Sequence, residues 1–253
     1  MTTIDLNSDM GEYDTPEWLA REAELMPLIT SANIACGIHA GNPDLMRRTA
    51  TLASQHNVAI GAHPGFPDAQ DFGRRDRQTS AEEVESLVST QLKHFADVVA
   101  SERLTFTHVK LHGALYNLAA KDPSVADAVA RAVTSFDPHL LLFALAGSEL
   151  VKSGRTAGLT VIQETFADRA YRSDGTLVPR SQPHALLRTE NQVRRQLREI
   201  LNGYVTSIDG QRVLILADSL CVHIDTPQAV EFLQLIRQEL DSAGIRIAKP
   251  LQT

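Results

Sequence analysis

One loop near the first quarter of the chain carries an unusual set of ionisable side chains. The apolar residues 58–62 have the composition of a strand, and glycine and proline interrupt the pattern directly after His63. Further ionisable residues follow in the same loop: Asp68, Asp71, Arg74 and Arg75. Functional residues are often placed on loops at strand ends, so this loop is a candidate site. The alternative is a polar surface turn held by a salt bridge.

The same pattern recurs at the ends of other predicted strands. Asp5, Asn7 and Asp9 alternate with apolar residues, which places all three on one face of the first strand. The candidates collected at strand ends are Asp9 and Glu12, Asn33 and His39, His63, Lys110 and His112, Glu164 with Asp168 and Arg169, and His223 with Asp225. Each residue alone could be structural, but convergence of so many ionisable groups indicates one site.

Two kinds of chemistry fit these residues. Imidazoles and carboxylates are common ligands of zinc and manganese, and a metal would be held among Asp9, His39, His63, His112 and His223. None of the spacings is that of a known zinc signature, which makes the metal site the less favoured interpretation, and metal-free acid–base catalysis is the alternative. Cationic groups would bind a substrate carboxylate or a phosphate, and salt bridges are their alternative role. These cations are Lys110, Arg169 and Arg75.

Standard nucleotide signatures are absent from the sequence. There is no Gly-x-x-x-x-Gly-Lys-Ser/Thr loop, and no Gly-x-Gly-x-x-Gly follows the first predicted strand. Cys36 or Cys221 could be a nucleophile beside a histidine, but their apolar flanks favour buried, unreactive thiols.

Composition limits the class of protein. The 253 residues carry a net charge of -7, and basic residues cluster only in pairs, which argues against a nucleic-acid surface. No apolar run reaches the roughly 18 residues of a membrane span, and no signal peptide is recognisable. Two cysteines in apolar surroundings are not a disulfide framework. We therefore expect a cytoplasmic protein without membrane or nucleic-acid partners, while homo-oligomerisation remains possible.

Seven strands, each followed by a helix, are predicted to position these residues. The predicted strands are residues 3–9, 31–36, 58–62, 105–111, 140–144, 159–165 and 212–217. Helix starts are marked by capping residues: Asn42-Pro43, Ser80 with Glu83, Asp122-Pro123, Ser148, Thr189 with Gln192, and Thr226-Pro227. Residues 166–188 form a connection long enough to be an ordered lid.

This βα repeat predicts an α/β fold with a parallel sheet in one domain, residues 1–253. A barrel is favoured over an open sheet, because a barrel brings all strand ends to one mouth, whereas an open sheet concentrates sites at one switch point.

Eight sequence strings resemble one known family, in order and over nearly the whole chain. They are DLNSDMGE (5–12), SANIACGIHAG (31–41), GAHPG (61–65), FGRR (72–75), VKLHGALYN (109–117), FADRAY (166–171), LVPR (177–180) and CVHIDTP (221–227). Together they resemble the LamB/YcsF family, the A subunits of bacterial ATP-dependent 5-oxoprolinases. The chain departs from the family pattern at Asn42, Leu111 and Ile224, where Asp, Pro and Gly are more usual.

The resemblance implies hydrolysis of 5-oxo-L-proline to L-glutamate, coupled to cleavage of ATP with Mg to ADP and phosphate, together with partner B and C subunits. It also implies a distorted (β/α)7 TIM-like barrel, similar to the glycoside hydrolase and deacetylase barrels. The expected catalytic residues are Asp9, Glu12, His39, His63, His112, Asp168 and His223. The expected substrate or phosphate ligands are Asn33, Lys110, Glu164, Arg169, Arg75 and Asp225.

In this hypothesis Lys110 and Arg169 hold anionic groups, and His63 or His112 is the general base. Asp9, Glu12 and Asp225 would orient imidazoles or a metal ion. Two other functions remain open. One is a metal-dependent deacetylase or amidohydrolase that acts alone, and the other is a non-catalytic subunit whose barrel mouth docks a partner. The low aromatic content of 5% argues against the docking role.

Overall fold

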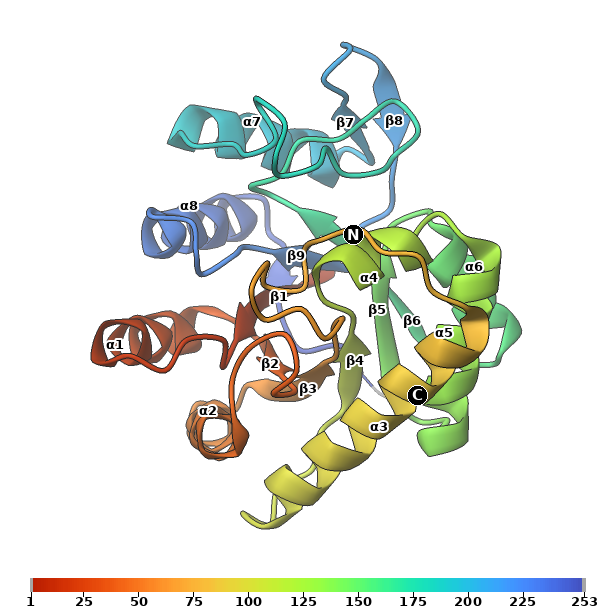
Figure 1. The fold of residues 1–253 in the computed structure, drawn as a ribbon. Helices are drawn as coiled ribbons and strands as arrows, with labels where there is room; N and C mark the ends of the chain where they lie inside the picture. The colour runs from red at the N-terminus through yellow and green to blue at the C-terminus, as the bar shows by residue number, and fades with distance from the viewer. Residues whose placement is uncertain (1, 252–253) are drawn as a thin grey trace.

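Seven parallel strands form a closed barrel in the computed structural model, which describes residues 2–251 (Figure 1). The barrel strands are β1 (Thr3–Met10), β2 (Ser31–Ala35), β3 (Ala59–His63), β4 (His108–Lys110), β5 (Leu141–Leu145), β6 (Val161–Phe166) and β9 (Ser219–Cys221). They follow one another in this order, and β9 pairs with both β6 and β1, with Asn7 opposite Cys221. The predicted α/β TIM-like barrel is therefore confirmed.

Helices surround the barrel, and most begin where the capping signals place them. They are α1 (Pro16–Leu25), the short η1 (Met26–Leu28), α2 (Pro43–Gln55), α3 (Ala81–Ala100), α4 (Gly113–Ala119), α5 (Pro123–Phe136), α6 (Glu149–Thr156), α7 (Glu190–Leu201) and α8 (Ala229–Ser242). Ser80 with Glu83 and Thr189 with Gln192 form the two predicted capping boxes. Asn42 and Asp122 accept backbone hydrogen bonds ahead of the prolines that open α2 and α5.

The prediction for the seventh strand is wrong. Residues 212–217 do not enter the barrel. Instead β8 (Arg212–Leu214) pairs antiparallel with β7 (Tyr204–Thr206), in a ribbon beside the barrel (Figure 1). The strand that closes the barrel is β9, only three residues long. The remaining short strand, β10 (Arg246–Ile247), pairs with the start of β1, outside the closed ring.

Three smaller differences affect the region around the site. The fourth strand is shorter than the predicted 105–111 and comprises His108–Lys110. Helix α4 was not predicted, because it begins at Gly113 with a positive φ of 56° and without a side-chain cap. Helix α8 begins at Ala229 after Gln228, and Thr226 does not cap it. The Thr226 hydroxyl donates instead to the carboxylate of Asp168.

The face of β1 that points into the barrel is polar, as its period-two pattern predicts. The Asp5 carboxylate accepts hydrogen bonds from the hydroxyls of Ser31 and Ser219, and Asn7 donates to Ser219. The apolar core lies between the barrel and the helices. Helix α3, for example, buries Val84, Val88, Leu92 and Phe95. Polar side chains from β1 therefore bond to their neighbours inside the barrel, while most of the hydrophobic contribution to stability comes from the outer layer. A small separate apolar cluster, Leu141, Phe143 and Ile162, lies beside the His108 ring.

The connection between β6 and α7 is ordered, as expected for residues 166–188. Two isolated antiparallel bridges fold it back on itself, Arg169 with Leu186 and Tyr171 with Leu177. The Tyr171 hydroxyl is fully buried and accepts a hydrogen bond from the backbone N–H of Phe166. Within residues 2–251 no helix is both long and apolar enough to span a membrane.

Candidate active site at the carboxyl ends of the barrel strands

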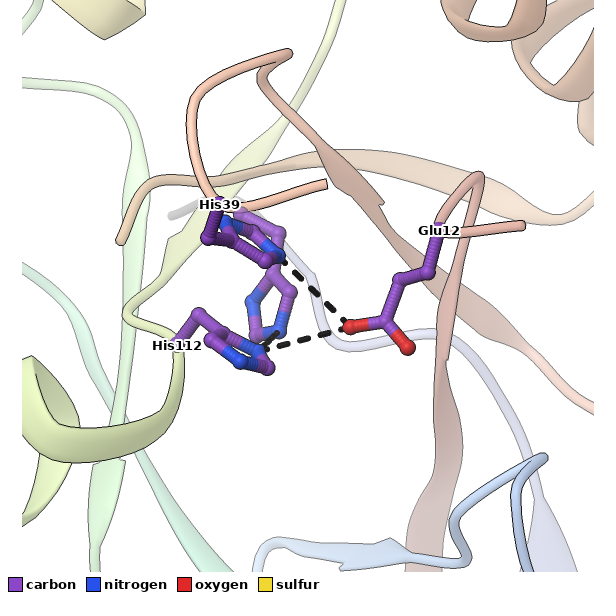
Figure 2. Close-up of side chains that lie close together, drawn as sticks. Glu12, His39 and His112 are labelled. Atoms are coloured by element: carbon purple, nitrogen blue, oxygen red, sulfur yellow. Dashed lines mark hydrogen bonds and ion pairs between the residues drawn. The ribbon is translucent and has the colours of Figure 1, made fainter. Parts of the chain in front are cut away.

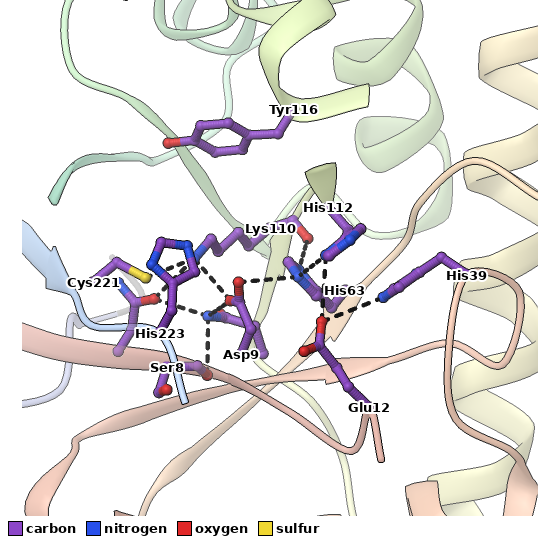
Figure 3. A network of polar contacts seen from close by, with 12 residues as sticks. Ser8, Asp9, Glu12, His39, His63, Lys110, His112, Tyr116, Cys221 and His223 are labelled. Carbon is purple, nitrogen blue, oxygen red and sulfur yellow. Dashed lines mark hydrogen bonds and ion pairs between the residues drawn. The ribbon is translucent and has the colours of Figure 1, made fainter. Parts of the chain in front are cut away.

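A cavity of about 470 Å³ lies at the carboxyl ends of the barrel strands, bordered by α4 and the loop after β6. Seven of the predicted site residues line it: Asp9, Glu12, Lys110, His112, Arg169, His223 and Asp225. This convergence follows from the parallel barrel, which directs every strand end to the same mouth. Figure 3 shows the network that most of these side chains form.

Lys110 is the centre of the network. Its ammonium lies 2.8 Å from Asp9 Oδ1 and 3.2 Å from Cys221 Sγ (Figure 3). Glu164 Oε1 lies 2.8 Å from the same ammonium. Burial alone would lower the pKa of Lys110, but the surrounding negative charges, Asp9 foremost, raise it well above its ordinary value. A protonated lysine thus borders the cavity between two carboxylates.

Asp9 is held ionised by its neighbours. Burial would raise its pKa, but His63 and Lys110 hold it well below the ordinary value for a carboxyl group. Burial likewise raises the pKa of the Cys221 thiol well above its usual range. A thiol in this state is a poor nucleophile, which argues against the cysteine alternative.

Three imidazoles and one carboxylate form a second, adjacent group. Glu12 Oε1 lies 3.6 Å from His39 Nε2 and 3.4 Å from His112 Nδ1 (Figure 2). His63 Nε2 lies 3.0 Å from His112 Nδ1 and 3.4 Å from Asp9 Oδ2. Burial lowers the pKa of His39 and of His112 well below the usual value, so both rings are neutral. Burial, followed by the charge of Asp9, raises the pKa of Glu12 to about 7.

Glycines make room for this close packing of rings. The rings of His39 and His112 stack with centroids 3.9 Å apart. A Cβ atom at Gly65 would lie 2.8 Å from His39 Nδ1, and one at Gly73 would lie 2.9 Å from His39 Cβ. The loop that follows β3 therefore contributes open space as well as His63 to the site.

His223 lines the opposite part of the cavity and is positioned by Asp168. Its Nδ1 lies 2.9 Å from Asp168 Oδ2, and its ring stacks on Phe166. Burial would raise the pKa of Asp168, but the contacts with His223 lower it to about 2. The arrangement is that of a base whose ring is oriented by a carboxylate.

Arginines form a cationic rim around the cavity. Arg74 and Arg180 both donate to Asp225 Oδ2 at 2.8 Å. Arg169 donates to the carbonyl of Val178, and its Nε has no hydrogen-bond partner within residues 2–251. Burial and the nearby charge of Arg180 lower the pKa of Arg169 to about 10, so it remains positively charged. The rim can bind a carboxylate or a phosphoryl group.

Five other predicted residues lie behind the cavity wall, where they contact the lining residues. Asn33, His39, His63, Glu164 and Asp168 are buried and are not part of the lining. Asn33 donates to Asp9, and Glu164 forms an ion pair with Lys110. The geometry therefore favours a role for Asn33 and Glu164 in positioning Asp9 and Lys110 over direct contact with the substrate.

Arg75 is the one predicted site residue that the structure does not bring to the cavity or to its wall. Its side chain is 76% exposed, 3.9 Å from Asp71, and outside the cavity, whereas the preceding Arg74 lines it. Sequence reasoning also missed Tyr116 and Arg180, although both fall within the family-like strings. Tyr116 lines the cavity from α4, and its hydroxyl donates to Glu164 Oε2 at 2.7 Å. The unpredicted α4 explains why Tyr116 was missed.

Two sets of side chains could hold a metal ion, judged by the separations of their ligand atoms. One is Glu12 with His39, His63 and His112, and the other is Asp9 with Cys221 and His223. Within each set the ligand atoms lie within 4.8 Å of one another. Compared with the residues predicted as metal ligands, the first set includes Glu12 and lacks Asp9 and His223.

Comparison with known proteins gives consistent matches over the whole chain. A protein from Geobacillus kaustophilus, named as the A subunit of 5-oxoprolinase, is 50% identical over 251 residues, 99% of this chain and 98% of its own. The crystal structure of a Lactam Utilization Protein from Thermus thermophilus has a TM-score of 0.86 and 40% identity, covering 98% and 99% of the two chains.

A more distant structure shares only the fold. The catalytic domain of a peptidoglycan N-acetylglucosamine deacetylase from Eubacterium rectale has a TM-score of 0.51 and 10% identity, covering 100% and 90% of the two chains. The similarity to deacetylase barrels that the sequence implies is therefore one of architecture. The LamB/YcsF family model matches residues 4–253, and the chain belongs to the LamB/YcsF family.

Proposed function

We propose that this chain is the A subunit of an ATP-dependent 5-oxoprolinase, which opens the lactam of 5-oxo-L-proline to give L-glutamate while ATP is cleaved to ADP and phosphate. The relatives named as A subunits of 5-oxoprolinase support the proposal, because the one from Geobacillus kaustophilus is 50% identical over nearly the full length of both chains. The Lactam Utilization Protein from Thermus thermophilus supports a lactam as the substrate class.

The observation that carries the proposal is the charge pattern of the cavity. 5-Oxoproline is a small anion with a ring carbonyl that accepts hydrogen bonds and a ring N–H that donates them. The rim offers Arg169 and Arg180 to its carboxylate, and the positive charge of Lys110 at the base of the cavity would attract the carbonyl oxygen. Glu12 can accept from the ring N–H. The volume of about 470 Å³ exceeds what a five-membered ring needs and leaves space for a phosphoryl group.

ATP would make the lactam reactive. An amide carbon is a poor electrophile, so transfer of the γ-phosphoryl group to the ring oxygen, with release of ADP, converts the amide into a better one. Water then adds to this carbon, the C–N bond breaks, and the ring nitrogen leaves as the amine, which gives an acyl phosphate. A second water cleaves that group to L-glutamate and phosphate. The two waters balance lactam opening and ATP hydrolysis.

The geometry changes the assignment of the base within this proposal. His63 lies behind the cavity wall, and neither nitrogen of His112 faces the cavity freely, because His63 Nε2 lies 3.0 Å from one and the carbonyl oxygen of Phe72 lies 2.8 Å from the other. His223 lines the cavity and is held through Nδ1 by Asp168, which leaves Nε2 as its basic atom. We therefore assign proton removal from water to His223. Lys110 would stabilise negative charge that develops on the ring oxygen.

The test is release of glutamate and phosphate from 5-oxoproline and ATP with magnesium. The chain is assayed alone and then with candidate B and C subunits. Equimolar glutamate and phosphate only in the complete mixture is the expected result. Folded protein that releases neither product in the complete mixture contradicts the proposal.

A second candidate function is a metal-dependent amidohydrolase or deacetylase that acts alone. The buried imidazoles beside Glu12 favour it, because histidine and carboxylate ligands are typical of metal-assisted hydrolysis. Hydrolysis of an amide or an acetylated sugar by the chain alone, with a divalent metal and without ATP, would establish this function instead.

A further inference from the structure

Two backbone carbonyls fix the ring protons of two neighbouring imidazoles. His63 Nδ1 lies 2.8 Å from the carbonyl oxygen of Lys110, and His112 Nε2 lies 2.8 Å from that of Phe72. Because a carbonyl oxygen only accepts, each of these two nitrogens carries a ring proton. With no second proton on either ring, the lone pairs are on His63 Nε2 and His112 Nδ1, which lie 3.0 Å apart. Two facing lone pairs repel one another unless a cation lies against both.

Buried polar atoms of the other two side chains of this group have no hydrogen-bond partner in the described part of the chain. His39 is 1% exposed, and neither of its ring nitrogens has such a partner in the part of the chain that the structure describes. Glu12 Oε1 is in the same situation, and it is the atom nearest to both His39 and His112 (Figure 2). Buried polar atoms normally have a partner, so these atoms indicate that one is missing.

We propose that Glu12, His39, His63 and His112 bind one divalent transition-metal ion, with zinc as the best match. Three imidazole nitrogens and one carboxylate oxygen are ligands that zinc prefers. A tetrahedral ion with bonds of about 2.0–2.1 Å holds its ligand atoms roughly 3.3 Å apart. Three separations in the group are 3.0, 3.4 and 3.6 Å, which bracket that value, and all four ligand atoms lie within 4.8 Å of one another.

One ring must move slightly for all four ligands to bind. The rings of His39 and His112 are stacked with an angle of 5° between their planes, so an ion in the plane of one lies off the plane of the other. His112 is held by the Phe72 carbonyl, whereas no hydrogen bond opposes rotation of the His39 ring. We therefore infer that His39 is the ligand that adjusts when the ion binds.

The neighbouring group of possible ligands already contains a cation. Lys110 Nζ contacts both Asp9 and Cys221, at 2.8 Å and 3.2 Å, and His223 Nδ1 is bound to Asp168. An ion among Asp9, Cys221 and His223 would have to displace the ammonium. Glu12 and His112 also line the cavity, so an ion at the first group would border it and could polarise a bound carbonyl oxygen or water.

Metal binding can be tested without substrate and without any assumption about the reaction. The full chain is stripped with a chelator, dialysed against zinc, and analysed for bound metal by elemental analysis and by calorimetric titration. One zinc ion per chain is expected. Cobalt(II) in place of zinc should give visible absorption bands typical of a low-symmetry site with nitrogen and oxygen ligands.

Four variants distinguish this site from others on the chain. His112→Ala should lose stoichiometric zinc, and Glu12→Gln, which keeps the size of the side chain, should weaken binding at least about tenfold. His94→Ala removes an exposed histidine of α3, and His223→Ala alters the neighbouring group, and both should retain one zinc ion. Circular dichroism and thermal midpoints establish that each variant is folded.

Several results would overturn the proposal. One is a folded chain without stoichiometric zinc, in which ¹⁵N NMR shows both ring nitrogens of His63 protonated, because a proton would then lie between the two rings. The others are unchanged zinc binding in Glu12→Gln and loss of zinc in His223→Ala alone.

Discussion

The carboxylate of Asp168 binds both the ring and the backbone of His223. Oδ2 accepts from Nδ1 at 2.9 Å and from the backbone N–H at 3.1 Å. The same oxygen also accepts from the Thr226 hydroxyl. Because β6 ends two residues before Asp168 and β9 ends two residues before His223, this contact joins two strand ends and fixes the orientation of a cavity-lining ring.

Replacing His223 tests its role as the base. His223→Ala should lower turnover by roughly 10²-fold to 10⁴-fold, because proton removal from water is lost. Asp168→Asn should also slow turnover, since an amide no longer favours the same ring tautomer. The double variant should be no slower than His223→Ala, because the two residues act as a unit. Steady-state kinetics of the complete enzyme measure these effects, with His94→Ala as the control. Normal turnover in folded His223→Ala would exclude this role.

Loss of the buried ammonium should destabilise the fold. Lys110→Met leaves Asp9 and Glu164 buried without their cation, and breaking such a pair costs about 3–5 kcal/mol. Lys152→Met is the matched control, because Lys152 lies 2.7 Å from Glu149 but is 67% exposed. That change should alter the free energy of unfolding by less than about 1 kcal/mol. Urea denaturation of the two variants measures the difference, and similar losses in both would contradict the prediction.

Glu22 should make stability depend on pH. Burial raises its pKa to about 7, although its carboxylate accepts from the Gly11 N–H and the Thr49 hydroxyl. The folded state therefore binds more protons than the unfolded state between about pH 4.5 and pH 7, and stability falls as pH rises through this window. Glu22→Gln keeps the shape without the ionisation.

The free energy of unfolding of Glu22→Gln should equal that of the wild type near pH 4.5. Above pH 7 it should be larger by roughly 3 kcal/mol, an order-of-magnitude figure from the pKa shift. Denaturation curves at several pH values give the difference between the two proteins. This difference isolates Glu22 from the other buried carboxyls. A constant difference across the window would contradict the assignment.

Gly61 provides space for the ring of His108 inside the barrel. A Cβ atom at Gly61 would lie 2.0 Å from His108 Nε2, the atom that contacts Asn33 Oδ1. Gly61→Ala should lower the free energy of unfolding by about 1–3 kcal/mol through overpacking. In a His108→Ala background the same change should cost less, because the ring is gone. A double-mutant cycle measures the coupling, and additive effects would exclude this contact as the cause.

Local signals were enough to predict most of the fold. The capping boxes at Ser80 and Thr189 and the Asn42-Pro43 pair depend on residues within one helical turn, so the sequence contains the whole interaction. The alternation of Asp5, Asn7 and Asp9 similarly depends only on strand geometry. The βα repeat predicted the barrel, and the barrel places these three side chains in its interior.

Features that depend on distant contacts were not predictable in this way. Residues 212–217 are more apolar than residues 219–221, yet the latter form the barrel strand because β1 and β6 are available on both sides. In the loop after β3, the side chains of the neighbouring Arg74 and Arg75 point in different directions. The ion pair with Asp225 holds the Arg74 side chain at the cavity. Tertiary contacts therefore determine which segment closes the barrel and which arginine lines the cavity.

Closure of the barrel by β9 has a consequence for synthesis on the ribosome. Residues 219–221 are the only link between β6 and β1 in the closed ring that the structure describes. Until they emerge, a nascent chain that already contains the other six barrel strands has two unpaired edges. Exposed edges of this kind pair readily with other chains. The six-stranded nascent sheet is therefore exposed to such pairing between translation of β6 and release of β9, and a pause in translation within the β7–β8 ribbon would prolong that period.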